Sequence, residues 1–210
     1  MYGEGRYPED IVSHRNNLES LQYTDEIFKA YVDAIIPRSP SLAEEYGRIQ
    51  YYGALDLYTD EYLIYSLNYS AVPIADDVAR MLEIAANYFL ATEMQEGAIK
   101  LEAMELSDFG SLTPMDRLRV MSLLEQAGAD IPGLSSLFAS DQSYIQAVTY
   151  ALNRLPLMGY YTEWSGYGTT RLLPPNQWVL EYEPISWEQV GYPGPSLGYR
   201  ALRVSNAQSI

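Results

Sequence analysis

Apolar residues recur every three or four positions along much of the chain, which is the spacing of an amphipathic helix. The clearest early case is the series Ile27, Tyr31 and Ala34, which follows Thr24 and ends before Pro37. Threonine is a favoured N-cap residue, and proline disrupts a helix interior. We therefore predict a first helix that begins at Thr24 and stops at Pro37.

Local start and stop signals divide the rest of the first 158 residues into further helices. Thr113, Pro114 and Asp116 form a capping pattern with proline at the first helical position, and Gly128 closes the run. Pro156 is interpreted as the end of the last helix. The predicted segments are 47–55, 59–67, 74–106 with a weak point at Gly97, 113–128 and 140–156.

Residues 160–203 contain all three tryptophans and many tyrosines but show almost no helical periodicity. Prolines and glycines at 174–175 and 191–195 force turns, and residues 180–185 favour a short extended piece. Strand signals are otherwise few, so the predicted fold is mainly α: an irregular helical bundle with an extended, aromatic, Gly/Pro-rich C-terminal strap. We divide the chain into an extended N-terminal arm (1–22), a helical domain (23–158) and an aromatic C-terminal segment (159–210) packed on the helical domain or on a partner.

Composition and charge narrow the possible partners. The chain has 210 residues, of which 48% are hydrophobic and 20% charged, as expected of one folded domain. A net charge of −15 repels phosphate groups, so nucleic acid is not expected as a partner. No apolar window approaches the ~18 residues of a membrane helix, and neither a signal peptide nor a twin-arginine pair is visible. We expect no direct membrane insertion and a cytoplasmic location.

Residue types that carry catalysis or bind metals are scarce. The absence of cysteine excludes disulfides, thiolate nucleophiles and zinc–thiolate sites, and the single histidine, His14, excludes a metal centre with two histidine ligands. The acids Glu93, Glu96, Glu102 and Glu105 lack the histidines of a di-iron site and fit a solvated helix face. We assign no catalytic, cofactor-binding or metal-ligating residues, and we expect no turnover by the isolated chain.

Aromatic residues of the C-terminal segment are the candidates for an interface. Tryptophan and tyrosine dominate interface hot spots, yet the same side chains also pack at the edge of a protein's own core. The sequence leaves open whether these rings face the chain's own helices or another chain. The interface candidates are Tyr160, Tyr161, Trp164, Tyr167, Trp178, Trp187, Tyr192 and Tyr199.

Three stretches, residues 32–37, 111–117 and above all 185–195, resemble the gluconate 2-dehydrogenase subunit 3 family. The resemblance spans roughly residues 24–200 and is most specific at Trp187 and the Gly-Tyr-Pro-Gly-Pro turn that follows. The family contains small, mostly helical subunits of bacterial FAD-dependent gluconate, sorbitol and glucose dehydrogenases. It implies a large flavoprotein partner that carries the FAD and oxidises a sugar or sugar acid, with no cofactor in this chain. Members that accompany exported dehydrogenases usually bring a twin-arginine signal, and this sequence departs from them there.

A second interpretation of the same composition is a self-assembling structural protein that reuses this scaffold, such as a spore, coat, crystal or storage component. An acidic, tyrosine-rich and cysteine-free chain suits that role as well. The partners are then other copies of the chain. The two hypotheses differ measurably, because the first predicts a bound flavoprotein and the second predicts assemblies of the chain alone.

Overall fold

The computed structural model describes residues 8–69, 72–96, 107–139 and 141–194, with side chains described from Leu21 onward except those of residues 93–96. Within these ranges the backbone forms helices and turns and no strand, which confirms the mainly α fold. No helix in the same ranges combines the length and the apolar character needed to cross a membrane.

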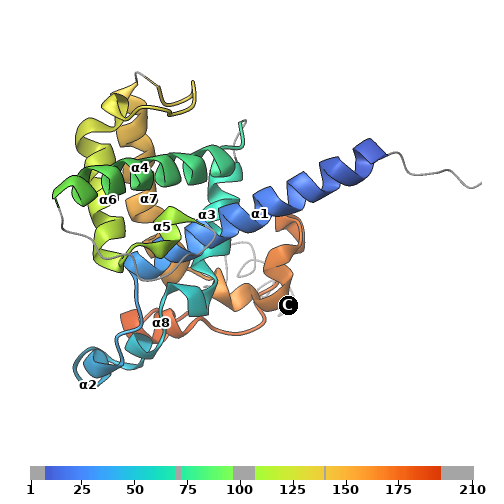
Figure 1. The fold of residues 1–210 in the computed structure, drawn as a ribbon. Helices are drawn as coiled ribbons and strands as arrows, with labels where there is room; N and C mark the ends of the chain where they lie inside the picture. Colours follow the sequence, from blue (N-terminus) through green and yellow to red (C-terminus); the bar gives the residue numbers. More distant parts are fainter. Residues whose placement is uncertain (1–7, 70–71, 97–106, 140, 195–210) are drawn as a thin grey trace, which may run out of the picture.

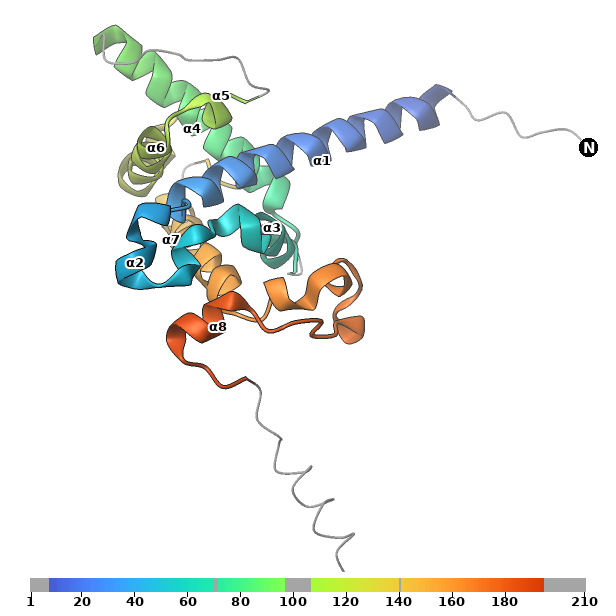
Figure 2. The same ribbon diagram turned by 90° about the horizontal axis from the view of Figure 1, so that it is seen from below.

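Five longer helices make up the body of the molecule (Figure 1). Helix α1 (Pro8–Ile35) lies across the others, and its N-terminal part extends beyond them (Figure 2). The other long helices are α3 (Thr59–Asn68), α4 (Ala75–Glu96), α6 (Pro114–Ala127) and α7 (Gln142–Tyr161). The shorter helices, in which η marks a 3₁₀ helix, are η1 (Pro40–Leu42), α2 (Ala43–Tyr46), η2 (Arg48–Tyr51), η3 (Ala54–Leu57), α5 (Asp108–Ser111), η4 (Gly128–Asp130), η5 (Ser165–Leu172), η6 (Pro175–Gln177) and α8 (Ile185–Val190).

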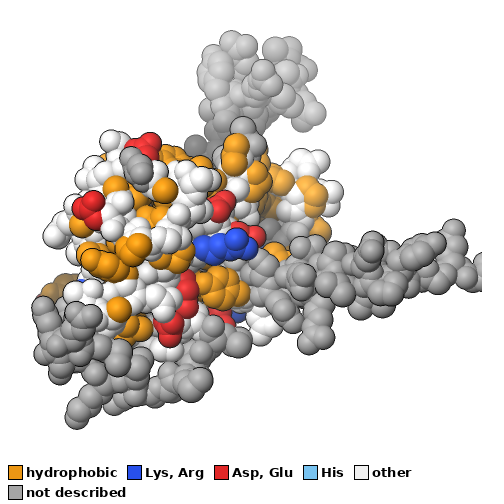
Figure 3. All heavy atoms as spheres, turned by 45° about the horizontal axis from the view of Figure 1, so that its top comes forward, with side chains coloured by type: hydrophobic (Ala, Val, Ile, Leu, Met, Phe, Trp, Pro, Cys, Tyr) orange, Lys and Arg blue, Asp and Glu red, His pale blue; other side chains and the backbone are white. Residues whose placement is uncertain are grey.

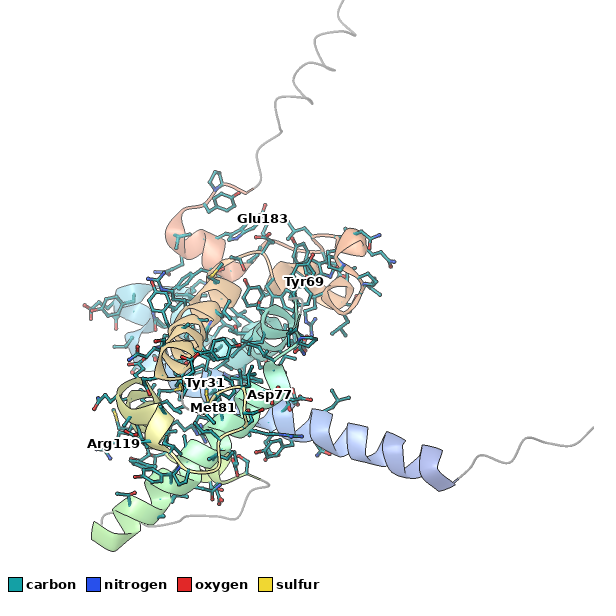
Figure 4. All side chains as sticks on the ribbon, turned by 90° about the horizontal axis from the view of Figure 1, so that it is seen from above. Tyr31, Tyr69, Asp77, Met81, Arg119 and Glu183 are labelled. Atoms are coloured by element: carbon teal, nitrogen blue, oxygen red, sulfur yellow. The ribbon has the colours of Figure 1, made fainter. Side chains whose placement is uncertain are left out.

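A buried apolar cluster joins the five long helices. Phe28 and Tyr31 of α1, Leu124 of α6 and Leu152 of α7 are fully shielded from solvent. Tyr31 and Met81 both lie in the interior of the bundle (Figure 4). Because each such side chain contributes roughly 1.5–3 kcal/mol when it leaves water, this cluster is the main source of the fold's stability.

The extended arm predicted for residues 1–22 is wrong from Pro8 onward, because α1 begins there. Proline suits the first helical position, and the acidic residues that follow it complement the helix dipole. Thr24 is consequently not a cap. It is buried within α1, and its hydroxyl donates a hydrogen bond of 2.8 Å to Asp76 Oδ1 at the start of α4. Residues 1–7 lie outside the described part.

The predicted helix end at Pro156 is also wrong, since α7 continues to Tyr161. Proline removes one backbone hydrogen bond from a helix interior. Here Pro156 is buried on the same face of α7 as Leu152 and Tyr160, and α7 packs against α3 and α6, so burial of the ring offsets the lost bond.

The helix predicted at 113–128 is confirmed in detail. Thr113 Oγ1 accepts a hydrogen bond of 3.2 Å from the backbone N–H of Asp116, Pro114 is the first helical residue, and Gly128 follows the last. At the start of the helix this agreement reflects local chemistry, because the threonine cap and the proline act within the first turn. Gly128 is right-handed, with φ of −57°, and a Cβ there would lie 2.8 Å from Cγ2 of Ile145, so packing against α7 requires the glycine.

Other predicted segments differ from the structure. The run at 47–55 is divided at Gly53, whose backbone N–H donates to Asp56 Oδ2 at 2.7 Å, so short helices replace one continuous helix. Helix α4 is described as far as Glu96, and the predicted continuation beyond it lies outside the described residues. The extended piece at 180–185 is unpaired with any strand in the described ranges, and α8 begins at Ile185.

Candidate functional site

The C-terminal segment, residues 162–194, folds back onto α3 and α7 and is fixed there by a buried tryptophan. Trp164 is 3% exposed, and its Nε1–H donates to the carbonyl oxygen of Tyr58 at 2.7 Å. Tyr58 precedes α3 and adopts a left-handed conformation with φ of 56°. The helix predicted over 59–67 does begin at Thr59, and Tyr58 is its N-cap residue.

A second anchor lies at the same end of α3. Arg171 Nε and Nη2 donate to the two carboxylate oxygens of Glu61 at 2.7 and 3.0 Å, and the guanidinium carbon lies 3.6 Å from the centre of the Tyr58 ring. The Arg171 side chain is only 10% exposed. A bidentate pair shielded in this way is stronger than an ordinary surface ion pair. It fixes η5 against the first turn of α3.

Internal hydrogen bonds shape the loop between η5 and α8. The backbone N–H groups of Glu181 and Tyr182 both donate to the carbonyl oxygen of Gly166, at 2.8 and 3.2 Å. A Cβ on Gly166 would lie 2.5 Å from the Tyr182 carbonyl oxygen, so this close approach requires glycine. Thr169 donates through its hydroxyl and its N–H to Glu181, and these bonds hold the pKa of that carboxyl below its usual value.

Six aromatic rings meet where this segment faces α3. Tyr65 is at the centre, with its ring centroid 5.2 Å from that of Tyr69, 5.8 Å from that of Trp164 and 5.2 Å from that of Trp178. Tyr69 lies where α3 approaches the C-terminal segment (Figure 4). We call the whole group the aromatic cluster; it comprises Tyr62, Tyr65, Tyr69, Trp164, Tyr167 and Trp178.

The aromatic cluster lines a groove of about 360 Å³ whose remaining lining residues are Ser66, Thr162 and Glu163. The hydroxyl of Tyr167 donates to Glu163 Oε1 at 3.1 Å. Burial, and then the charge of Glu163 and this hydrogen bond, raise the pKa of Tyr167 to about 12. The groove is therefore lined by aromatic rings together with one carboxylate.

The predicted interface residues fall into three groups. Tyr160, Trp164 and Trp187 are at most 6% exposed and pack against this chain's own helices. Tyr161 and Tyr192 are open to solvent. Tyr167 and Trp178 are partly buried and line the groove. The eighth candidate, Tyr199, lies outside the described residues.

Three residues of the aromatic cluster were not among the predicted candidates. Tyr62, Tyr65 and Tyr69 follow one another at intervals of three and four along α3 and its end, so they share a helix face. That spacing alone is equally typical of residues at the edge of a core. Only the position of the C-terminal segment, about 100 residues later in the chain, makes them part of a site.

The outer side of the same segment carries exposed aliphatic residues. Leu172, Leu173 and Val179 are 72, 45 and 61% exposed, and we call them the outer apolar patch. Hydrogen bonds fix the backbone beside them: Trp178 Nε1–H donates to the Leu173 carbonyl at 2.8 Å, and the Thr170 hydroxyl donates to the Val179 carbonyl at 2.9 Å. The loop is thus fixed with three apolar side chains facing water.

Tyr160 ties the C-terminal end of α7 to the turns before α3. Its hydroxyl oxygen lies 2.8 Å from the Tyr52 carbonyl oxygen and 3.2 Å from that of Ile49. Burial, followed by the neighbouring Tyr161 and the charge of Asp56, raises the pKa of Tyr160 from 10.0 to about 12. The folded protein therefore stabilises the neutral phenol.

This pKa predicts an alkaline loss of stability. A raised folded-state pKa contributes stability that is complete below pH 10.0, the unfolded value, and that disappears as the pH rises through about 12. We expect Tyr160→Phe to lower the free energy of unfolding by about 1 kcal/mol at neutral pH and to reduce the decline above pH 10.0. Urea unfolding at a series of pH values measures both effects. An unchanged alkaline decline in the variant contradicts the assignment.

Within the described ranges no three acidic or histidine side chains gather closely enough to hold a metal ion. The side chains of His14, Glu93 and Glu96 are outside the described ones, as are Glu102 and Glu105. A second groove, of about 320 Å³, lies between α4 and α6 and is lined by Tyr88, Phe89, Thr92, Arg119, Ser122, Leu123 and Gln126.

No protein-family model matches the chain, and neither a curated protein nor a solved structure matches it. The resemblance noted above therefore rests on its three stretches alone. Of residues 185–195, the most specific of them, those up to Gly194 form α8 and the turn after it, and Pro195 lies outside the described residues. Gly191, with φ of 66°, ends α8 in the left-handed conformation, and Trp187 is 6% exposed with its ring 4.8 Å from that of Tyr192.

Proposed function

We propose that this chain is a non-catalytic interaction subunit that docks the large subunit of an FAD-dependent dehydrogenase through its C-terminal segment. The observation that carries the proposal is the outer apolar patch. Its three side chains face water, although the same segment packs Trp164 and Trp187 inward. Because a fixed and exposed apolar group gains free energy when a partner covers it, the patch has the character of a docking surface.

The C-terminal segment is attached to the helices by its buried side, which leaves the outer apolar patch on its exposed side. The buried Trp164 and the pair between Arg171 and Glu61 fix the segment before any partner arrives. A surface that is already ordered loses little conformational entropy on binding. The outer apolar patch is therefore preorganised for association.

Charge favours a different protein over a second copy as the partner. At a net charge of −15, two copies repel each other, whereas a neutral or basic surface is attracted. Figure 3 shows one face on which hydrophobic patches lie among acidic side chains and basic side chains cover little area. The resemblance to the gluconate 2-dehydrogenase subunit 3 family suggests what the partner is, and the proposal places the FAD and the redox step there.

Capture from the organism that encodes the chain tests the proposal. The tagged chain is expected to retain a large protein with the absorbance of bound FAD. Val179→Asp, which puts a charge into the outer apolar patch, is expected to reduce the retained FAD by about tenfold or more. Met115→Asp is the matched control, because Met115 is 60% exposed at the start of α6. Equal losses in the two variants, or the absence of any flavoprotein, contradict the proposal.

The oligomeric state of the purified chain distinguishes docking of a flavoprotein from self-assembly. Sedimentation velocity is expected to show a monomer, in agreement with the repulsion between copies. Stable oligomers that Val179→Asp dissociates and Met115→Asp leaves intact would instead assign the outer apolar patch to contacts between copies of the chain.

A further inference from the structure

We propose that the groove of the aromatic cluster binds a quaternary ammonium group of a small solute. Six rings, three from α3 and its end and three from the C-terminal segment, line one groove of about 360 Å³. A cation within about 6 Å of a ring centre is attracted by the negative face of the π system. The volume falls within the roughly 300–1,000 Å³ range of small-molecule sites.

A carboxylate at the groove complements the rings. Glu163 is exposed, and its Oε1 accepts the hydrogen bond from Tyr167. Among the described residues no lysine or arginine lies within ion-pair distance of Glu163. The groove therefore has a negative charge whose neutralising cation does not come from the described side chains.

The same chain contains a filled version of this arrangement at the other end of α3. Arg171 lies 3.6 Å over the ring of Tyr58 and pairs with the carboxylate of Glu61. Ring, cation and carboxylate are all supplied internally there. The groove presents the same two chemical groups, aromatic rings and a carboxylate, and both attract a positively charged ligand.

The pKa values of two tyrosines in the groove report on its electrostatic environment. The pKa of Tyr167 is raised to about 12, with the charge of Glu163 as a contributing cause after burial. The pKa of Tyr65 is raised by burial and then by Tyr69 and Tyr62. Burial disfavours charge of either sign, so only the contribution of Glu163 reports a negative potential at the groove, and the net charge of −15 adds to it over the whole surface.

The polar lining selects among ligands. Apart from the tyrosine hydroxyls and the indole groups, it comprises Ser66, Thr162 and Glu163. A neutral sugar gains hydrogen bonds from such groups but nothing from the charge of Glu163, whereas a trimethylammonium group gains from that charge and presents a weakly hydrated positive surface to the rings. The quaternary ammonium group is therefore the better match.

Binding of choline to the purified chain, with no partner present, tests this proposal independently of the docking function. Its neutral isostere 3,3-dimethylbutan-1-ol has the same shape without the charge. Trp164 and Trp178 line the groove, so intrinsic fluorescence reports occupancy. We expect a saturable change with choline and binding at least about tenfold weaker with the isostere.

Variants assign the signal to the groove. Tyr65→Leu keeps apolar volume but removes the central ring, and we expect it to weaken choline binding by about tenfold. Glu163→Gln is expected to weaken binding several-fold and to reduce its dependence on salt. Tyr150→Leu is the control, since Tyr150 is 55% exposed on α7 and is not part of the groove. Circular dichroism melting confirms that each variant is folded.

Three results overturn the proposal. Equal affinity for choline and the neutral isostere shows an apolar groove without cation recognition. Unchanged choline binding by the folded Tyr65→Leu variant places the ligand elsewhere. No saturable change up to about 10 mM choline, ten times a millimolar dissociation constant, shows that the groove is not such a site.

Discussion

Trp164→Ala is expected to lower the free energy of unfolding by about 3–5 kcal/mol and to release the C-terminal segment from α3. The indole is 3% exposed, and its ring lies 5.4 Å from that of Tyr62 and 5.5 Å from that of Trp178. Its removal also takes away the hydrogen bond of 2.7 Å from Nε1–H to the Tyr58 carbonyl, which then accepts only from the Tyr62 N–H at 3.2 Å. A cavity and a lost hydrogen bond arise together.

Urea unfolding and limited proteolysis measure this effect. The matched control is Trp178→Ala, because Trp178 is only partly buried in the same cluster and donates to the exposed loop at Leu173. The control is expected to lose less stability and to keep the segment resistant to protease. Equal losses for the two variants contradict the view that Trp164 is the anchor.

Trp187→Ala is the second large effect, again about 3–5 kcal/mol if α8 unfolds with the rest of the protein. Trp187 is 6% exposed and stacks edge-to-face on Tyr192 at 4.8 Å. The backbone N–H of Tyr192 also donates to the Trp187 carbonyl at 2.9 Å, which closes the turn after α8. We expect the variant to lose the ordered turn.

The control for this variant is Glu188→Ala, the next residue along α8. Glu188 and Arg48 form an ion pair of 3.6 Å in which both side chains are about 70% exposed, so its loss has little effect. Thermal unfolding followed by circular dichroism compares the two. An unchanged melting temperature for Trp187→Ala shows that its ring does not support the fold.

Local signals explain what the sequence predicts correctly. Thr113 and Pro114 act within the first turn of α6, so they define its start without tertiary context. The carbonyls of Leu124 and Glu125 near its end instead accept hydrogen bonds from the Gln142 side chain of α7. The same logic fails at Pro156, because burial of its ring depends on helices that are distant in the chain. It also fails at Thr24, whose hydroxyl bonds to Asp76 on another helix rather than capping its own.

The candidate site depends on long-range packing to a greater degree. Sequence reasoning selected Trp164, Tyr167 and Trp178 by residue type, and the structure brings them together. It missed Tyr62 and Tyr65, since a tyrosine on an amphipathic helix has the same local pattern whether it borders a core or a groove. Whether these tyrosines border a core or a groove depends on the C-terminal segment, about 100 residues later in the chain.

Hydrogen exchange measured by mass spectrometry on the captured complex tests the docking claim most directly. Backbone amides of the chain are compared alone and with the partner bound. We expect added protection across residues 172–182, where the outer apolar patch lies, and little change in α4 and α6. Protection confined to α4 and α6, with residues 172–182 exchanging as in the free chain, would contradict it.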